Sequence, residues 1–326
     1  MRRWAYCVLL LLAAALLCLA QERGRPAVVE WTPDGKILIA SNGLLARFDF
    51  SSGEETLLAR RVDAFAISSD GARLALGGLD TLTLRRYPGL EADSSPPLPA
   101  PAAVTALAWS PDNQTLAAGT ATGHLLLWDL SANELWADLN VAPPSAVERL
   151  RFSADGARLL STFADGRALL WDLERREEVH RFALPRNPQG ELEGQVMVAD
   201  LSPDGRLVLA TQLSAAAEGR EDADPEMVLL DDRGAVKWRR AGYAMEFTRD
   251  GTSVLALAPP FRIAALYQAA DAAALRIFEP PEEVTTLYLV RQSPDGKRLA
   301  GVGEDHRGQV LVLWDFSTAA VLKTRR

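Results

Sequence analysis

Apolar positions alternate with small or polar positions in short runs along most of the chain, and turn-forming residues separate the runs. The pattern is clearest in one stretch of four runs, at 104–110, 115–120, 124–128 and 134–139. Pro111-Asp112-Asn113 and Ala121-Thr122-Gly123 stand between the first three. Alternation with a period of two, punctuated by Pro, Asp, Asn and Gly, predicts strands joined by tight turns. The stretch therefore predicts one four-stranded antiparallel sheet with 134–139 at its outer edge.

The first turn of this unit recurs through the whole sequence as Ser/Thr-x-Asp-Gly. The copies centre on Asp34, Asp70, Asp112, Asp155, Asp204, Asp250 and Asp295, with Asn113 in place of glycine in the third. Successive Asp positions are 36, 42, 43, 49, 46 and 45 residues apart. A period of about 40 to 45 residues is typical of one propeller blade. The sequence predicts an all-β fold, a seven-bladed β-propeller of four-stranded antiparallel blades.

The two ends of the repeat array predict how the ring closes. The first copy begins with its own inner strand, 28–31, and the last copy carries its own outer strand, 319–323. We therefore expect contiguous blades that exchange no strand.

Three third strands end in a dipeptide, Trp128-Asp129, Trp171-Asp172 and Trp314-Asp315, which resembles the dipeptide that gives WD40 repeats their name. The resemblance covers about 300 residues, from Val28 to the C-terminus, and it implies a non-enzymatic propeller that acts as an interaction scaffold. The other copies end in different residues. Related secreted propellers with Ser-Pro-Asp-Gly turns are close alternatives.

WD40 blades usually bury a hydrogen-bonded network of His, Ser, Asp and Trp, which this chain keeps only in part. Ser161 and Asp165 stand at the spacing expected before Trp171, but none of the three histidines precedes a first strand. We therefore expect these blades to depend more on apolar packing than WD40 blades usually do.

The first twenty residues have the pattern of a secretory signal peptide. Arg2 and Arg3 precede an apolar stretch, and Cys18-Leu19-Ala20 provides small residues for cleavage before Gln21. The expected domains are a signal peptide at 1–20 and a single propeller at 21–326, exported to the periplasm or the cell exterior, with no membrane insertion after cleavage. The alternative is an uncleaved N-terminal anchor, because the apolar run is just short of the roughly 20 residues that span a bilayer.

Composition narrows the partners and the chemistry. Both cysteines, Cys7 and Cys18, lie in the signal segment, so the mature protein would have neither thiol chemistry nor a disulfide. Without its first twenty residues the chain has 33 basic and 43 acidic side chains and a net charge of −10. That surface disfavours nucleic acid as a partner. We expect a monomer that binds protein.

Candidate catalytic or ligand-binding groups are sparse. His124, His180 and His306 are far apart in sequence, and neither a zinc-binding spacing nor a phosphate-binding glycine loop is present. No catalytic, metal or cofactor residues are predicted. The acidic run 221–226 supplies oxygen ligands of the kind that Ca²⁺ prefers, which leaves a Ca²⁺-stabilised adhesive module as one alternative.

Blade length varies through insertions that the repeat assigns to one face. The Asp-Gly turns and the turns between third and fourth strands define an Asp-Gly face; the turns between second and third strands and the connections between blades define the opposite, insertion face. The long segments assigned to the insertion face are 92–99, 185–194, 214–225 and 303–307. Binding residues concentrate on loops of rigid scaffolds. The predicted partner-binding residues, beside blade 5, are Arg186, Gln189, Glu191, Arg220, Asp222 and Asp224.

Inner strands supply the second set of candidate residues. Glu30, Glu148, Asp200 and Glu246 lie on predicted first strands, which line the centre of a propeller. If these carboxylates converged in one pocket, the chain could be a hydrolase or lyase with a carboxylate-lined funnel. The primary expectation is a non-enzymatic scaffold, and the enzyme is the alternative.

Overall fold

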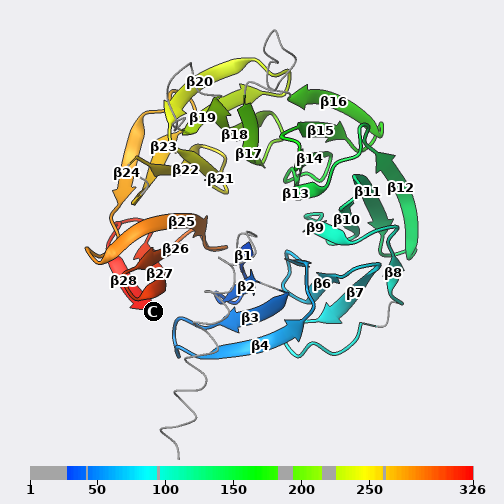
Figure 1. Ribbon diagram of the computed structural model, residues 1–326, viewed down its shortest axis with the longest axis horizontal. Helices are drawn as coiled ribbons and strands as arrows, with labels where there is room; N and C mark the ends of the chain where they lie inside the picture. Colours follow the sequence, from blue (N-terminus) through cyan, green and yellow to red (C-terminus); the bar gives the residue numbers. More distant parts are fainter. Residues whose placement is uncertain are drawn as a thin grey trace, which may run out of the picture.

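The described residues form a ring of seven four-stranded antiparallel sheets, seen in Figure 1 as blades around a common centre. A computed structural model describes residues 28–41, 43–93, 96–182, 194–214, 225–259 and 262–325. Their regular secondary structure is all strand, so they contain no helix that could cross a membrane. The predicted fold class is confirmed.

Each blade runs from the centre of the ring outward in sequence order. The innermost strands are β1 (Val28–Trp31), β5 (Ala64–Ile67), β9 (Val104–Trp109), β13 (Val147–Phe152), β17 (Gly194–Leu201), β21 (Tyr243–Phe247) and β25 (Val284–Gln292). The second strands are β2 (Ile37–Ser41), β6 (Arg73–Gly77), β10 (Thr115–Thr120), β14 (Arg158–Phe163), β18 (Leu207–Ser214), β22 (Ser253–Ala258) and β26 (Arg298–Asp305). The third strands are β3 (Leu44–Phe48), β7 (Thr81–Arg86), β11 (His124–Asp129), β15 (Ala168–Asp172), β19 (Pro225–Asp231), β23 (Ile263–Gln268) and β27 (Gly308–Asp315). The outermost strands are β4 (Glu55–Arg60), β8 (Leu98–Pro99), β12 (Glu134–Asn140), β16 (Glu177–Phe182), β20 (Val236–Ala241), β24 (Ala274–Phe278) and β28 (Val321–Arg325).

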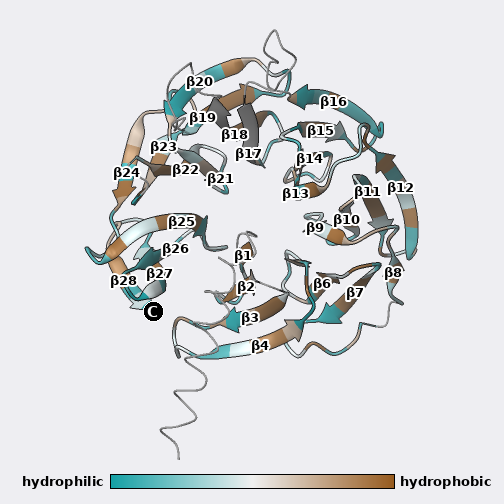
Figure 2. Cartoon of the chain, in the orientation of Figure 1, coloured by the Kyte–Doolittle hydropathy of each residue, from teal (hydrophilic) through white to brown (hydrophobic). Residues whose placement is uncertain are grey.

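The hydrophobic core lies between blades, because each sheet buries both of its faces against its neighbours. Most second and third strands are largely buried: β22 is fully buried, and so are residues 125–128 of β11, whereas β7 of blade 2 buries only alternate residues. Outer strands face solvent on one side, and β16 is largely hydrophilic in Figure 2. A blade is therefore stable only with a partner on each side.

The Asp-Gly turn repeats one hydrogen-bonded geometry in all seven blades. The Ser or Thr hydroxyl is buried and donates to the Asp carboxylate two residues later, at 2.5–2.6 Å in blades 2 to 7 and also between Thr32 and Asp34 in blade 1. The same hydroxyl accepts the N–H that opens the second strand, for example that of Arg158 on Ser153 at 2.9 Å. The glycine, or Asn113, has φ between 59° and 77°, which explains the residue choice.

These turns also connect neighbouring blades. A Cβ on Gly71 would lie 2.9 Å from Cγ of Pro33 in blade 1, and a Cβ on Gly251 would lie 3.1 Å from Cδ of Pro203 in blade 5. The N–H of Ala154 in blade 4 donates to the carbonyl of Pro203 at 2.7 Å. The residue between Ser and Asp thus packs against the turn of the adjacent blade.

The ring closes without strand exchange, as expected from the sequence. Blade 7 consists of β25 to β28 and blade 1 of β1 to β4, so the two blades share no strand, and side chains join them. Trp31 Nε1 donates to the carbonyl of Arg291 at 3.0 Å. The Lys323 ammonium donates to the carbonyl of Phe50, and the Arg325 guanidinium lies 5.3 Å from the ring centre of Phe48.

Two of the four predicted loop insertions, 92–99 and 303–307, are wrong, because both segments contain strand residues. Residues 92–99 do not join blades 2 and 3; they contain the outer strand of blade 2, where Leu98–Pro99 pairs with Thr81–Leu82 and Ala92 bridges to Arg85. Prolines lack the N–H needed for a longer ladder, which obscured this strand. Residues 303–307 are not a loop insertion either, because Asp305 pairs with Gly308 and the extra residues lengthen β26 and β27.

Replacing Ser153 by Ala is expected to lower the free energy of unfolding by about 1–2 kcal/mol, because the N–H of Arg158 loses its acceptor. The matched control is Ser317→Ala, which removes an exposed hydroxyl that also donates to an Asp carboxylate and should cost less than about 0.5 kcal/mol. Urea denaturation of both variants measures the difference. Equal stability would contradict the structural role of the buried hydroxyl.

Candidate functional site

The predicted partner-binding residues lie outside the described residues. Arg186, Gln189 and Glu191 belong to the segment 183–193, and Arg220, Asp222 and Asp224 belong to 215–224. The described ends of these segments meet in blade 5, however. Gly194 pairs with Ser214, and Leu213 pairs with Pro225. Both segments therefore leave the ring from adjacent strand ends on the insertion face.

Three of the four predicted inner-strand carboxylates, Asp200, Glu246 and Glu30, are close enough to Arg151 to raise its pKa. Asp200 is 6% exposed and its carboxylate lies 3.1 Å from Nε of Arg151 in blade 4. Its other oxygen accepts the N–H of Phe247 in blade 6 at 2.8 Å. One side chain thus joins three successive blades.

Glu246 has the same kind of role one blade further on. It is 8% exposed, accepts the N–H of Gln292 in blade 7 at 2.5 Å, and lies 3.6 Å from the Arg291 guanidinium. Burial raises the pKa of the Glu246 carboxyl, and Arg291 opposes that shift. Glu30 is half-buried and Glu148 is exposed.

The arginines that lie beside these carboxylates were not among the residues predicted from the sequence. Arg149 and Arg151 lie on β13 and Arg291 lies on β25. Burial and the nearby Arg291 charge lower the pKa of Arg149 to about 10, with Asp200 and Glu30 opposing the shift. The neighbouring Asp200 charge raises the pKa of Arg151, whose side chain is 51% exposed. The alternating polar positions in 147–152 could have revealed these cations.

Uncharged side chains complete the polar contacts between inner strands. Trp109 Nε1 donates to the carbonyl of Ala66 in blade 2 at 3.0 Å, which matches the bond from Trp31 to blade 7. Thr105 donates to the carbonyl of Val147 in blade 4 at 2.6 Å. The centre of the ring is thus held by bonds between blades. Of the carboxylates there, Asp200 and Glu246 are engaged with cations and backbone amides.

The WD40-like network of blade 4 contains Trp171 and Ser161 but not Asp165. Trp171 Nε1 donates to Ser161 Oγ at 2.9 Å, as expected from the resemblance. Asp165 instead pairs with Arg167, whose Nε donates to it at 2.7 Å. Arg167 also donates to the carbonyls of Ala142 and Pro143, so it fastens the connection between blades 3 and 4.

The other candidate groups are separate from one another. His124 pairs with Asp138 at 3.0 Å on the surface of blade 3, His180 packs against Phe182 in blade 4, and His306 accepts from Arg307 in blade 7. Within the described ranges, no three or more His, Cys, Asp or Glu side chains are grouped to hold a metal ion. Of the acidic run 221–226, Glu226 is described, and it pairs with Arg239.

Comparison with known proteins supports the resemblance. A family model described as the WD40 domain of anaphase-promoting complex subunit 4 matches residues 107–199. This segment extends from β9 into β17. It therefore covers blades 3 and 4, which carry Trp128-Asp129 and Trp171-Asp172. No curated protein sequence matches the chain.

Together, the match over residues 107–199 and the seven four-stranded blades support a WD40-repeat-like β-propeller. WD40 propellers generally mediate protein interactions and are generally non-enzymatic.

Asp200→Ala is expected to destabilise the protein by about 2 kcal/mol, because it leaves the N–H of Phe247 without its acceptor and removes the partner of Arg151. Glu148→Ala, on the neighbouring inner strand and exposed, should change stability by less than about 0.5 kcal/mol. Thermal unfolding of the two variants provides the comparison. A stable Asp200→Ala variant would show that this carboxylate does not join the blades.

Proposed function

We propose that the protein is an exported, non-enzymatic scaffold that binds another protein on the insertion face beside blade 5. The observation that carries the proposal is the meeting of strand ends at Gly194, Ser214 and Pro225, from which the segments 183–193 and 215–224 leave adjacent positions. Residues from both segments can therefore contribute to one binding surface. A rigid ring is a suitable support for such a surface.

The inner-strand contacts favour the scaffold over the propeller enzyme. A hydrolase or lyase would need carboxylates directed at a substrate. Asp200 and Glu246 instead accept backbone N–H groups from the next blade and face arginines. The carboxylates of Asp200 and Glu246 therefore join neighbouring blades.

A capture experiment tests the binding face. Crosslinking and affinity capture from the native cell envelope would be carried out with the wild-type protein and with a variant whose residues 214–225 are replaced by a short Gly-Ser turn. The replacement keeps the hairpin connection between β18 and β19 and removes Arg220, Asp222 and Asp224. We expect the variant to lose the specific partner. Recovery of the same partners by both proteins would argue against a site at blade 5.

Export is the second part of the proposal, and the N-terminal sequence supports it. In a secretion-competent host the full chain should appear outside the cytoplasm with Gln21 as its first residue, as determined by mass spectrometry. A control with Leu11 and Leu12 both replaced by Arg disrupts the apolar stretch and should stay inside the cell. An intact N-terminus in the membrane fraction would favour the anchor, and a cytoplasmic wild-type protein would contradict export.

A further inference from the structure

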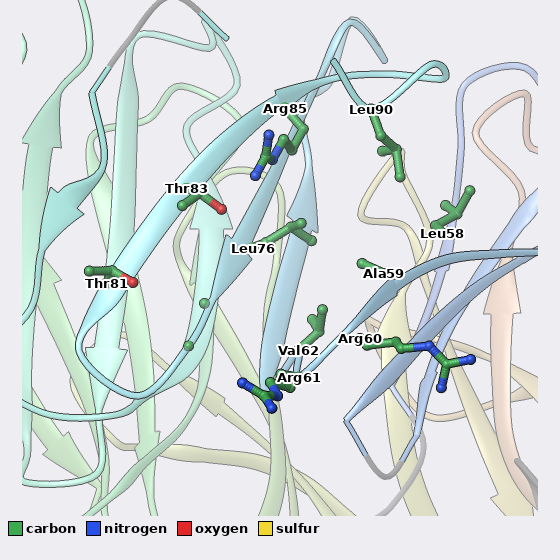
Figure 3. Close-up of a pocket in the computed structure, with 12 residues that line it drawn as sticks. Leu58, Ala59, Arg60, Arg61, Val62, Leu76, Thr81, Thr83, Arg85 and Leu90 are labelled. Carbon is green, nitrogen blue, oxygen red and sulfur yellow. The ribbon is translucent and has the colours of Figure 1, made fainter. Parts of the chain in front are cut away.

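A cleft of about 330 Å³ lies between the outer strand of blade 1 and the second and third strands of blade 2. One wall comes from β4 and the residues just after it, and the other comes from β6 and β7 (Figure 3). The volume is at the small end of the range of roughly 300–1,000 Å³ typical of ligand sites. The lining residues are all described.

The cleft exists because β7 presents polar residues to blade 1. Thr81, Thr83 and Arg85 alternate with Leu82 and Leu84, which are buried against blade 3. In Figure 3, Thr81, Thr83 and Arg85 follow one strand along the cleft. The corresponding residues of β11 and β15 are buried on both sides. Blade 2 thus leaves unfilled a volume that the Trp-Asp blades fill with apolar side chains.

Three arginines border this cleft, and they have no partner among the residues that the structure describes. Arg60 and Arg61 come from blade 1 and Arg85 comes from blade 2; Arg61 and Arg85 lie at opposite ends of the cleft in Figure 3. None of the three side chains has an ion pair or hydrogen bond with another described residue. In contrast, Arg151 and Arg158 each face a carboxylate. Unpaired guanidinium groups on a chain of net charge −8 are ready to bind an anionic group.

The backbone at Arg61 supports this interpretation. Its φ is 59°, a conformation that glycine or asparagine adopts more readily than arginine. The other described non-glycine residues with positive φ lie in the hairpin turns of the Asp-Gly face, whereas Arg61 lies in the connection between two blades. A charged side chain therefore stands at a backbone position that would be easier for glycine.

Apolar side chains complete the cleft. Val62, Leu58, Leu76 and Leu90 line it, and the last three are only partly buried. Leu79, in the turn between β6 and β7 at the edge of the cleft, is 77% exposed. A small inorganic anion would use the arginines alone, whereas an acidic peptide with an aliphatic residue would use both kinds of surface.

We propose that this cleft binds an extended segment of a partner protein in which Asp or Glu side chains stand on both sides of an aliphatic side chain. The two carboxylates pair with Arg61 and Arg85 at the two ends of the cleft, the threonine hydroxyls supply further donors, and the aliphatic side chain covers Leu58 and Leu76. The inference rests on the proposed scaffold function and adds a second site to it, away from blade 5.

Purified wild-type protein would be used to select binders from a phage-displayed library of random heptapeptides. A fluorescein-labelled copy of the most enriched peptide is then titrated by fluorescence anisotropy. We expect enriched sequences to contain Asp or Glu on both sides of Leu, Ile or Val. Binding should weaken about ten-fold in R85E and in R61G, since each removes one charge-assisted contact. Arg61→Gly keeps the positive φ without steric cost, so it tests the charge with the backbone preserved.

The matched control is Arg86→Glu, which makes the same charge change on the adjacent residue of β7, directed to the other side of the sheet. It should bind the peptide as the wild type does. Acid-free peptides, or unchanged binding in both R85E and R61G, would overturn the proposal. Displacement of the peptide by inorganic phosphate, beyond the effect of sodium chloride at equal ionic strength, would also overturn it, because the cleft would then be a small-anion site.

The proposal for the cleft and the proposal for the blade-5 site can be disproved independently. Unchanged peptide binding by the protein with residues 214–225 replaced, together with loss of the captured partner, would support both proposals. Loss of peptide binding in R85E, with normal capture of the partner, supports peptide binding in the cleft. The blade-5 site is tested by the replacement of 214–225. Peptide binding that depends on 214–225 and not on Arg85 would overturn the cleft alone.

Discussion

The whole structure depends on each sheet having a neighbour on both of its faces. A single four-stranded blade cannot bury two apolar faces by itself, so each blade is stabilised by both of its neighbours and the ring must close to cover the end blades. Here the seam between blades 1 and 7 has no shared strand. It is held by the indole of Trp31 on the carbonyl of Arg291, by Lys323 on Phe50, and by Arg325 against Phe48. Closure therefore depends on side chains at the two ends of the described chain.

The residues of the Asp-Gly turn have two roles: they form the reversal between two strands, and they contact the adjacent blade. Locally, its buried hydroxyl and carboxylate satisfy backbone groups where two strands meet, and the left-handed residue reverses the chain. Globally, the residue after Ser packs against the glycine of an adjacent blade, as Pro33 does against Gly71. This double use accounts for the faithful repetition of the turn in all seven blades, whereas the Trp-Asp dipeptide is present in three of the seven copies.

The sequence could predict the blades because strand alternation and turn chemistry are local. Strands such as Val28–Trp31 and Thr115–Thr120 agree with their predicted limits. The wrong assignments arose where a local signal is ambiguous. Prolines in 92–99 resemble a linker although Leu98 and Pro99 pair with β7, and the strands around His306 are simply longer. The partner-binding residues lie outside the described ranges, so that prediction stays a prediction.

The arginines show why a site is harder to predict than a fold. Arg149 and Arg151 stand on an inner strand that the alternation identified, yet their significance depends on Asp200 and Glu246, which are about fifty and a hundred residues away in sequence and belong to other blades.

The same residue type also has opposite roles in two places. Near the centre, Arg151 and Arg291 compensate carboxylates that join blades. Between blades 1 and 2, Arg61 and Arg85 compensate no described carboxylate, and polar side chains stand where β11 and β15 have apolar ones. A repeat protein departs from its own pattern at a cost in packing. The departure in β7 leaves both unpaired charge and uncovered apolar surface, and an acidic, partly aliphatic ligand compensates both.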